Sequence, residues 1–212
     1  MGMDAIRLDQ RNLPERVAEL LLTRVTTGAI SIGSRIAELP LSKELGISRS
    51  TLREGLRLLE ARGIVQSLPQ KGSYVRRCDQ RSIGTIYATR EALELRAFDL
   101  LTESDRLPTL LARLIIIAEA MREDSNNAKA ILNKLDIEFH TTIIEAAEDF
   151  VLSSIWGAIK DHLTVIFSLE RANGAEYASD HLAIVKALAK RDKPRLVAAY
   201  RRHVAKGRLN VS

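Results

Sequence analysis

The stretch from Leu41 to Glu60 constrains the fold most strongly, because its apolar residues recur at spacings that describe two short helices sharing one seam. Gly46 falls where the chain must bend between the two helices. The second helix begins at about Ser48, so its exposed first turn carries hydroxyl and guanidinium side chains. The positions that we expect to be buried in the seam are Leu41, Leu45, Ile47, Leu52, Leu56 and Leu59.

A β-hairpin is expected directly after these helices. Gly63 is suited to end the second helix, and residues 64–68 and 73–76 have the pattern of two short strands joined by a turn at Pro69–Gly72.

A further helix precedes the two helices that share the seam. It is expected to start at an Asn12 cap and to stop at Gly28, with an apolar face of Val17, Leu20, Leu21 and Val25.

Beyond Arg77 we find no residue pattern typical of β-strands. The rest of the chain has the apolar periodicity of about six helices. The fold class is therefore mainly α, with an N-terminal winged helix-turn-helix of three helices plus a β-hairpin, followed by an all-α antiparallel helical bundle. We place the domain boundary near Cys78–Asp79, which gives domains at 1–78 and 79–212. The six helices are expected at residues 79–102, 106–123, 126–147, 149–171, 175–191 and 193–208.

Charge is distributed unevenly between the two expected domains. The whole chain has a net charge of +5, and residues 1–78 hold 13 lysines and arginines against 8 aspartates and glutamates. Residues 79–212 hold 19 of each sign. This asymmetry favours a basic domain for a polyanion such as nucleic acid, joined to a neutral domain with another task. A chance imbalance is the alternative, since five charges are few.

The cysteine content and the apolar runs bear on the cellular compartment. A single cysteine, Cys78, excludes a disulfide within the chain, and we expect no signal peptide at the start. The longest unbroken apolar run, at residues 114–118, is far shorter than the roughly 18 residues of a membrane helix. We therefore expect a cytoplasmic protein without a membrane role.

The start of the helix after Gly46 has the chemistry of a DNA-reading surface. Amides at a helix N-terminus and short hydroxyls bind phosphate, and an arginine can donate two hydrogen bonds to guanine in the major groove. The alternative is that Ser48 only caps the helix and that the arginines form a solvated face. The candidate DNA contacts are Ser48, Arg49, Ser50, Thr51 and Arg53, with Lys71 and Gly72 at the hairpin tip.

All four histidines lie in the second domain. Asp136 and His140 are four residues apart and project from one helix face, and His181 and His203 each share a face with apolar residues. One aspartate and three inward histidines could converge on a divalent metal ion. The alternative is that each histidine is a hydrogen-bonded core residue and that Asp136 and His140 form a buried ion pair.

Four runs of the first domain resemble the winged-helix domain of GntR-type bacterial transcription regulators. The resemblance implies that the residues at the start of the second seam helix contact double-stranded DNA, with Gly72 near the minor groove. Leu39 stands where some members of the family have an arginine, so the operator sequence is expected to differ accordingly. The four runs are Gly33–Ile36, Leu41–Glu54, Leu58–Val65 and Lys71–Val75.

The second domain is similar to the FCD effector domain of the FadR-type branch of these regulators, and six helices would fit its VanR-like subgroup. The resemblance rests on the stretch Asp136–His140, on His181 with the residues after it, and on His203. It implies that Asp136, His140, His181 and His203 hold a divalent metal, zinc first, with nickel, manganese or iron as alternatives. His162 does not match this set, and we expect it in the core or the pocket wall.

Two further positions bear on the effector site. Glu148 and Asp149 replace a Gly-Asn pair that is often found after the metal-binding helix. Arg90 matches an arginine common at the start of FCD domains, and it would pair with a carboxylate of a small organic acid. The alternative is a surface arginine paired with Glu94, four residues on.

The resulting prediction is a homodimeric DNA-binding transcription regulator, with repression as the expected mode. A small carboxylate metabolite in the metal-containing pocket would control its affinity for the operator. A purely structural metal is the second hypothesis, and a metal-dependent enzyme is the third. We expect no enzyme, because no glutamate neighbours a ligand histidine in a position to act as general acid or base.

Overall fold

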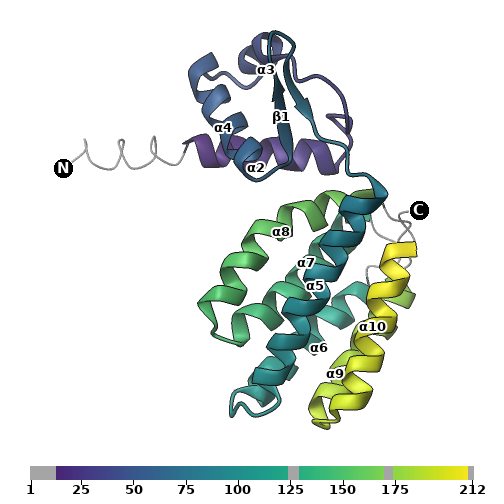
Figure 1. Ribbon diagram of the computed structural model, residues 1–212. Coiled ribbons are helices and arrows are strands. Elements are labelled where there is room, and N and C mark those ends of the chain that lie inside the picture. Colours follow the sequence, from purple (N-terminus) through teal and green to yellow (C-terminus); the bar gives the residue numbers. More distant parts are fainter. Residues whose placement is uncertain (1–12, 124–128, 170–173, 210–212) are drawn as a thin grey trace, which may run out of the picture. The chain divides into compact units, whose positions relative to one another are not determined.

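The structure is a computed structural model that describes residues 13–123, 129–169 and 174–209 (Figure 1). The chain divides into two compact units between Arg77 and Cys78, one residue before the expected boundary. The expected Asn12 cap, the first three residues of the expected helix at 126–147 and the last two of that at 149–171 lie outside the described residues.

In the residues that the structure describes, from Leu13 on, the first unit contains three helices and a two-stranded antiparallel sheet, as the sequence predicts. The helices are α2 (Leu13–Thr26), α3 (Glu38–Glu44) and α4 (Arg49–Ala61). Strand β1 (Val65–Leu68) pairs with β2 (Gly72–Val75) in the register that places Val65 opposite Val75. The purple helix α2 packs against α4 (Figure 1), and the buried face of α2 consists of Val17, Ala18, Leu21 and Val25.

Three apolar positions differ from the sequence prediction. Leu20 was expected on the buried face of α2, but it is 40% exposed, because that face is centred on Ala18 instead. Leu45 and Ile47 are only half-buried, whereas the other four positions of the helix-turn-helix seam are buried. These two residues flank the bend at Gly46, which has a φ of +64° that suits glycine.

Helix α4 is fixed at its start and along its packed face. The Ser48 side chain caps the helix by accepting a hydrogen bond of 3.1 Å from the Thr51 amide. Gly55 lets α2 approach closely, because a Cβ at this position would lie 2.7 Å from a methyl carbon of Val17. The local sequence therefore presents the first turn of α4 while its other face is held in the core.

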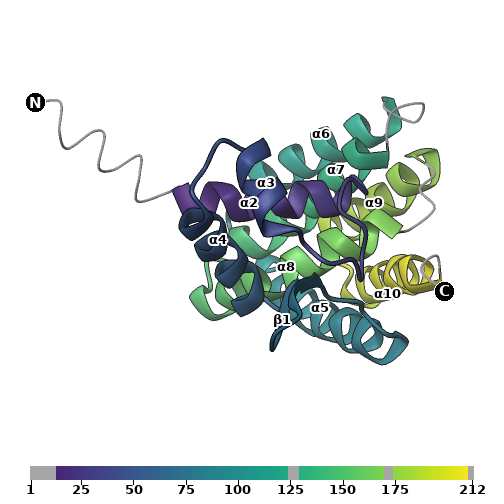
Figure 2. The same ribbon diagram turned by 90° about the horizontal axis from the view of Figure 1, so that it is seen from above.

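The second unit consists of six helices in the described residues, each within three residues of its expected bounds. Helix α7 packs against α5, α6 and α8, and α10 packs against α5 and α9. Both views show the yellow helix α10 running alongside α9 (Figure 2). The helices are α5 (Gln80–Leu101), α6 (Leu107–Glu123), α7 (Lys129–Ala146), α8 (Phe150–Leu169), α9 (Gly174–Ala189) and α10 (Lys193–Leu209).

Helix α8 is the one described helix that is long and apolar enough to cross a membrane, with a mean hydropathy of 1.3. Its apolar residues pack into the core of the bundle through Trp156, Leu163 and Phe167. The Trp156 indole also donates a hydrogen bond of 2.9 Å to the Thr141 hydroxyl on α7. These contacts are typical of a core helix in a helical domain.

Candidate functional site

Three helices bring four candidate metal ligands together inside the second unit. Asp136 and His140 come from α7, His181 comes from α9 and His203 comes from α10. All four residues are buried, and their candidate ligand atoms lie within 4.8 Å of one another. One ion with bonds of about 2.0–2.2 Å needs its ligand atoms within roughly this distance of each other.

Two atoms of this cluster are buried polar groups that lack a hydrogen-bond partner among the described residues. These atoms are Oδ1 of Asp136 and Nε2 of His181, which face each other at an ion-pair distance of 3.0 Å. Buried polar atoms in native proteins nearly always have a partner, and an unpartnered one carries a desolvation penalty. A cation between them would satisfy both atoms.

Hydrogen bonds on the outer side of two histidines orient their rings. His181 Nδ1 donates to the Tyr177 carbonyl at 2.7 Å, and His140 Nδ1 donates to the Glu94 carboxylate. Because a neutral imidazole has one N–H, both residues direct the lone pair of Nε2 into the cluster. This is the arrangement that outer hydrogen bonds impose on metal-binding histidines.

The two neighbours of His203 Nε2 require opposite hydrogen-bonding roles of this nitrogen. Arg90 Nη2 lies 3.2 Å from this nitrogen and donates to it, which requires a lone pair there. His140 Nε2 lies 3.1 Å away and also bears a lone pair, which requires His203 to donate instead. A cation bound by both ring nitrogens would remove the conflict between the two histidines, and it would replace Arg90 as the partner of the His203 lone pair. The residues present therefore fit a divalent cation.

Burial and charge set the protonation of the cluster. Burial lowers the pKa of both His140 and His203, so their imidazoles are neutral and able to bind metal at neutral pH. Imidazole nitrogens and one carboxylate are a donor set suited to zinc, nickel, manganese or iron.

Arg90 is not a surface residue, because only 2% of its side chain is exposed. Its Nε donates to Glu94 Oε1 at 2.9 Å, and its guanidinium carbon lies 5.2 Å from the centre of the Phe167 ring. The Glu94 pairing foreseen for a surface arginine therefore forms in the core instead. Burial lowers the pKa of Arg90, but Glu94, Tyr200 and Asp136 more than compensate, so the guanidinium stays charged.

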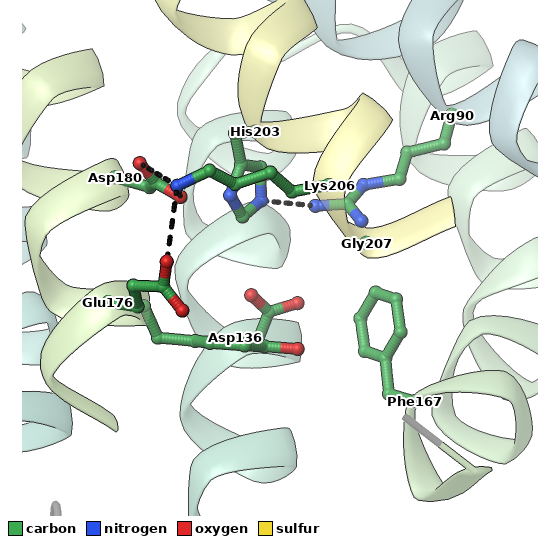
Figure 3. Close-up of a pocket in the computed structure, with 9 residues that line it drawn as sticks. Arg90, Asp136, Phe167, Glu176, Asp180, His203, Lys206 and Gly207 are labelled. Atoms are coloured by element: carbon green, nitrogen blue, oxygen red, sulfur yellow. Dashed lines mark hydrogen bonds and ion pairs between the residues drawn. The ribbon is translucent and has the colours of Figure 1, made fainter. Parts of the chain in front are cut away.

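A small cavity of about 30 Å³ adjoins the cluster. It has room for roughly two water molecules. Figure 3 shows Arg90 and Phe167 on one side of the cavity and Asp180 on the other, with Asp136 and His203 between them. Lys206 crosses from α10 and donates to Asp180 at 2.8 Å. His162 is half-buried on α8 and is not among the lining residues.

The candidate DNA contacts gather on the first unit at the start of α4 and at the hairpin. Arg49, Ser50 and Arg53 are exposed. The hydroxyls of Ser50 and Thr51 each lie 2.8 Å from Ser48 Oγ, so this turn presents a connected set of hydroxyl groups. Lys71 is exposed in the turn between β1 and β2, and Gly72 begins β2.

A groove between α3, α4 and the hairpin adds residues that the sequence prediction missed. It is lined by Arg35, Arg49, Arg53 and Gln70, among others. Arg53 Nε forms an ion pair of 2.7 Å with Glu38 on α3, so this arginine is held in place before any DNA is bound. The Glu38 pairing had no sequence signal, because fifteen residues separate the partners.

The arrangement defines a class of protein. A helix-turn-helix with a following hairpin, joined to a helical domain with a buried polar cluster, is a DNA-binding transcription regulator. The chain belongs to the GntR family of bacterial regulatory proteins: residues 13–75 match that family, and residues 85–206 match the FCD domain. The mainly helical fold class and the resemblance to GntR regulators with an FCD domain are confirmed.

Relatives and solved structures agree with this assignment. The chain is 32% identical to the gluconate operon transcriptional repressor of Bacillus subtilis over 68% of its own length and 59% of the repressor. It is 26% identical to the "Probable D-xylose utilization operon transcriptional repressor" of Paenarthrobacter nicotinovorans, over 96% and 91% of the two chains. A GntR regulator structure from Rhodococcus sp. RHA1 superposes with a TM-score of 0.77 at 18% identity, covering 93% of this chain and 96% of that one.

These comparisons establish the general function. The chain is a transcription regulator and not an enzyme, as the sequence predicts. Regulators of the GntR family bind DNA operators, and the first unit has the fold for that task. The buried Asp136 and histidine cluster is present in the domain that follows.

Proposed function

We propose that this protein is a homodimeric, cytoplasmic repressor that senses a small organic acid through a metal ion held by Asp136, His140, His181 and His203. The observation that carries the proposal is the convergence of these four buried side chains beside Arg90 and a cavity. Zinc is the metal that we expect first, because three imidazoles and a carboxylate suit it.

The metal and Arg90 together account for the ligand class. A metal held by Asp136, His140, His181 and His203 would supply a Lewis acid for a carboxylate oxygen of the ligand. Arg90 carries a buried positive charge on the cavity wall and presents N–H groups suited to a carboxylate. The gluconate operon repressor, a relative, is named for a hydroxy acid, which supports an acid as the ligand.

The first unit supports operator binding in a dimer. A helix-turn-helix regulator reads two half-sites about one DNA turn apart, so two copies are required for a palindromic operator. We assign base and phosphate contacts to Arg49, Arg53 and the hydroxyls of Ser48, Ser50 and Thr51. Lys71 and Gly72 are assigned to the backbone or the minor groove beside them.

Regulation follows if the acid binds one arrangement of the dimer better than the other. The ligand changes operator affinity only by its differential affinity for the two arrangements, typically about 1–3 kcal/mol. Two relatives are named as repressors, so ligand binding is expected to release the operator.

Metal content tests the site. Purified protein is expected to contain close to one metal ion per chain by elemental analysis, and His181→Ala is expected to lose it. His162→Ala is the matched control, because His162 lies outside the cluster and should leave the metal in place. Equal metal content in His181→Ala and in unaltered protein would remove His181 from the site. A metal that stabilises the protein without any response to acids would indicate a structural ion.

A further inference from the structure

We propose that Glu94 is a positioning residue for the metal centre: it holds His140 in the tautomer that binds metal and ties that histidine to Arg90. The inference rests on the proposed function, because it concerns the metal that the cluster would bind. Glu94 lies on α5, which contributes no metal ligand itself. Its role would extend the site to a fourth helix.

Unlike a surface glutamate, Glu94 is buried and has a partner for each of its carboxylate oxygens. Its side chain is completely buried, and each of its two oxygens has its own partner. Oε1 accepts from Arg90 Nε at 2.9 Å, and Oε2 accepts from His140 Nδ1. One carboxylate therefore connects the candidate anion-binding arginine to a candidate metal ligand.

The direction of the hydrogen bond to His140 determines what its other nitrogen can do. An ionised carboxylate accepts hydrogen bonds and has none to donate, so the imidazole proton must be on Nδ1. The Arg90 guanidinium, whose Nε lies 2.9 Å from Oε1, pairs with Glu94 as an ionised carboxylate. His140 Nε2 then keeps its lone pair, and it faces Asp136 and His203 at 3.8 and 3.1 Å.

A purely structural role for Glu94 makes a different prediction. If Glu94 only ties α5 to α7, any side chain of the same shape that hydrogen-bonds there should preserve metal binding. If Glu94 sets the tautomer, the polarity of the hydrogen bond matters as well as its presence. The variant Glu94→Gln separates these two roles, because glutamine has nearly the same size and shape.

Glutamine cannot serve both partners of Glu94. With its amide nitrogen toward His140, it donates to Nδ1 and moves the imidazole proton to Nε2, where it blocks metal binding. With its oxygen toward His140, its NH₂ group faces the N–H of Arg90, and two donors oppose each other. The second orientation is therefore disfavoured, and the first orientation weakens the metal centre.

Zinc affinity is the main measurement. We expect Glu94→Gln to bind Zn²⁺ about 10- to 100-fold more weakly than unaltered protein, in competition with a chromogenic chelator. Glu91→Gln is the matched control, because Glu91 lies one turn earlier on α5 and pairs with Arg201 at the surface. The control should bind Zn²⁺ like the unaltered protein. Zinc affinity of Glu94→Gln within threefold of that of the control would overturn the proposal.

A second measurement addresses the tautomer directly and does not depend on a variant that folds. The ¹⁵N shifts of the His140 ring in metal-free, unaltered protein should show a protonated Nδ1 and an unprotonated Nε2. A protonated Nε2 would overturn the proposal. Failure of the proposed function has a distinct signature: the unaltered protein and Glu91→Gln would then both fail to bind Zn²⁺, whatever the tautomer of His140.

Discussion

The Nε2 atoms of His140 and His203 lie 3.1 Å apart, although the two histidines are 63 residues apart in the sequence. Glu94 leaves His140 with a lone pair at this nitrogen, and Arg90 donates to the nitrogen of His203. Two inward lone pairs at this distance repel each other unless a cation lies between them. This pair is the strongest indication that the core of the second unit binds a metal.

Arg90 and a metal ion make competing use of His203 Nε2, which leads to a first prediction. Arg90→Met removes the cationic partner of buried Glu94, so the metal-free protein should lose about 3–5 kcal/mol of unfolding free energy. Zn²⁺ affinity should not fall, because the lone pair of His203 becomes free. The stabilising response to acids should disappear.

Urea unfolding with and without Zn²⁺ measures these effects. Arg96→Met is the control, since Arg96 is exposed on the same helix and should change neither stability nor ligand response. If Arg90→Met still responded to acids like the unaltered protein, Arg90 would have no part in ligand binding.

Arg49 is exposed at the start of α4, and its removal should act on DNA alone. We expect Arg49→Ala to weaken specific operator binding by about 1–3 kcal/mol while the melting temperature stays unchanged. The measurement is fluorescence anisotropy with a DNA site selected from a random pool by the unaltered protein. Arg57→Ala, two turns further along α4, is the control. Unchanged operator affinity in Arg49→Ala would contradict the assignment.

Glu148 lies between α7 and α8 with a φ of +51°, a conformation that favours glycine. Glu148→Gly should therefore stabilise the protein by about 1 kcal/mol. Its ion pair with Arg106 is exposed and should matter little. Glu145→Gly is the opposite control, since it places glycine inside the last turn of α7 and should destabilise by about 1 kcal/mol. Equal shifts of the urea midpoint for both variants would refute the strain at Glu148.

The contact between α2 and α4 gives a prediction for the first unit. Gly55→Ala should destabilise it by about 1–3 kcal/mol, because the added methyl group would lie 2.7 Å from a Val17 methyl carbon. Circular dichroism during thermal unfolding reports the change. Combining the variant with Val17→Ala should recover part of the loss by making room. A double variant that melts below both single variants would show that this contact is not the cause.

Much of the fold could be predicted because its signals are local. Caps, glycine stops and helical periodicity placed the six helices of the second unit within three residues of their bounds. Leu20 was assigned to the wrong face because periodicity alone does not show which residues α4 covers. A packing partner decides that, and it lies elsewhere in the sequence.

The candidate site was only partly visible in the sequence for the same reason. Helical spacing put Asp136 and His140 on one face, but only the packing of α5, α7 and α10 brings Arg90 and His203 beside them. Glu94 was noted as a partner for Arg90, and the sequence gave no sign of its contact with His140, 46 residues away. Long-range hydrogen bonds of this kind have no local signature.

The central claim is that a metal-bound acid controls the affinity for DNA, and one titration tests it directly. Operator affinity is measured for zinc-loaded protein, for chelator-treated protein and for His181→Ala against a panel of mono-, di- and tricarboxylates. The account predicts that at least one acid weakens operator binding of the zinc-loaded protein about 5- to 150-fold and leaves the other two forms unaffected. An equal response with and without metal, or no response to any acid, would contradict it.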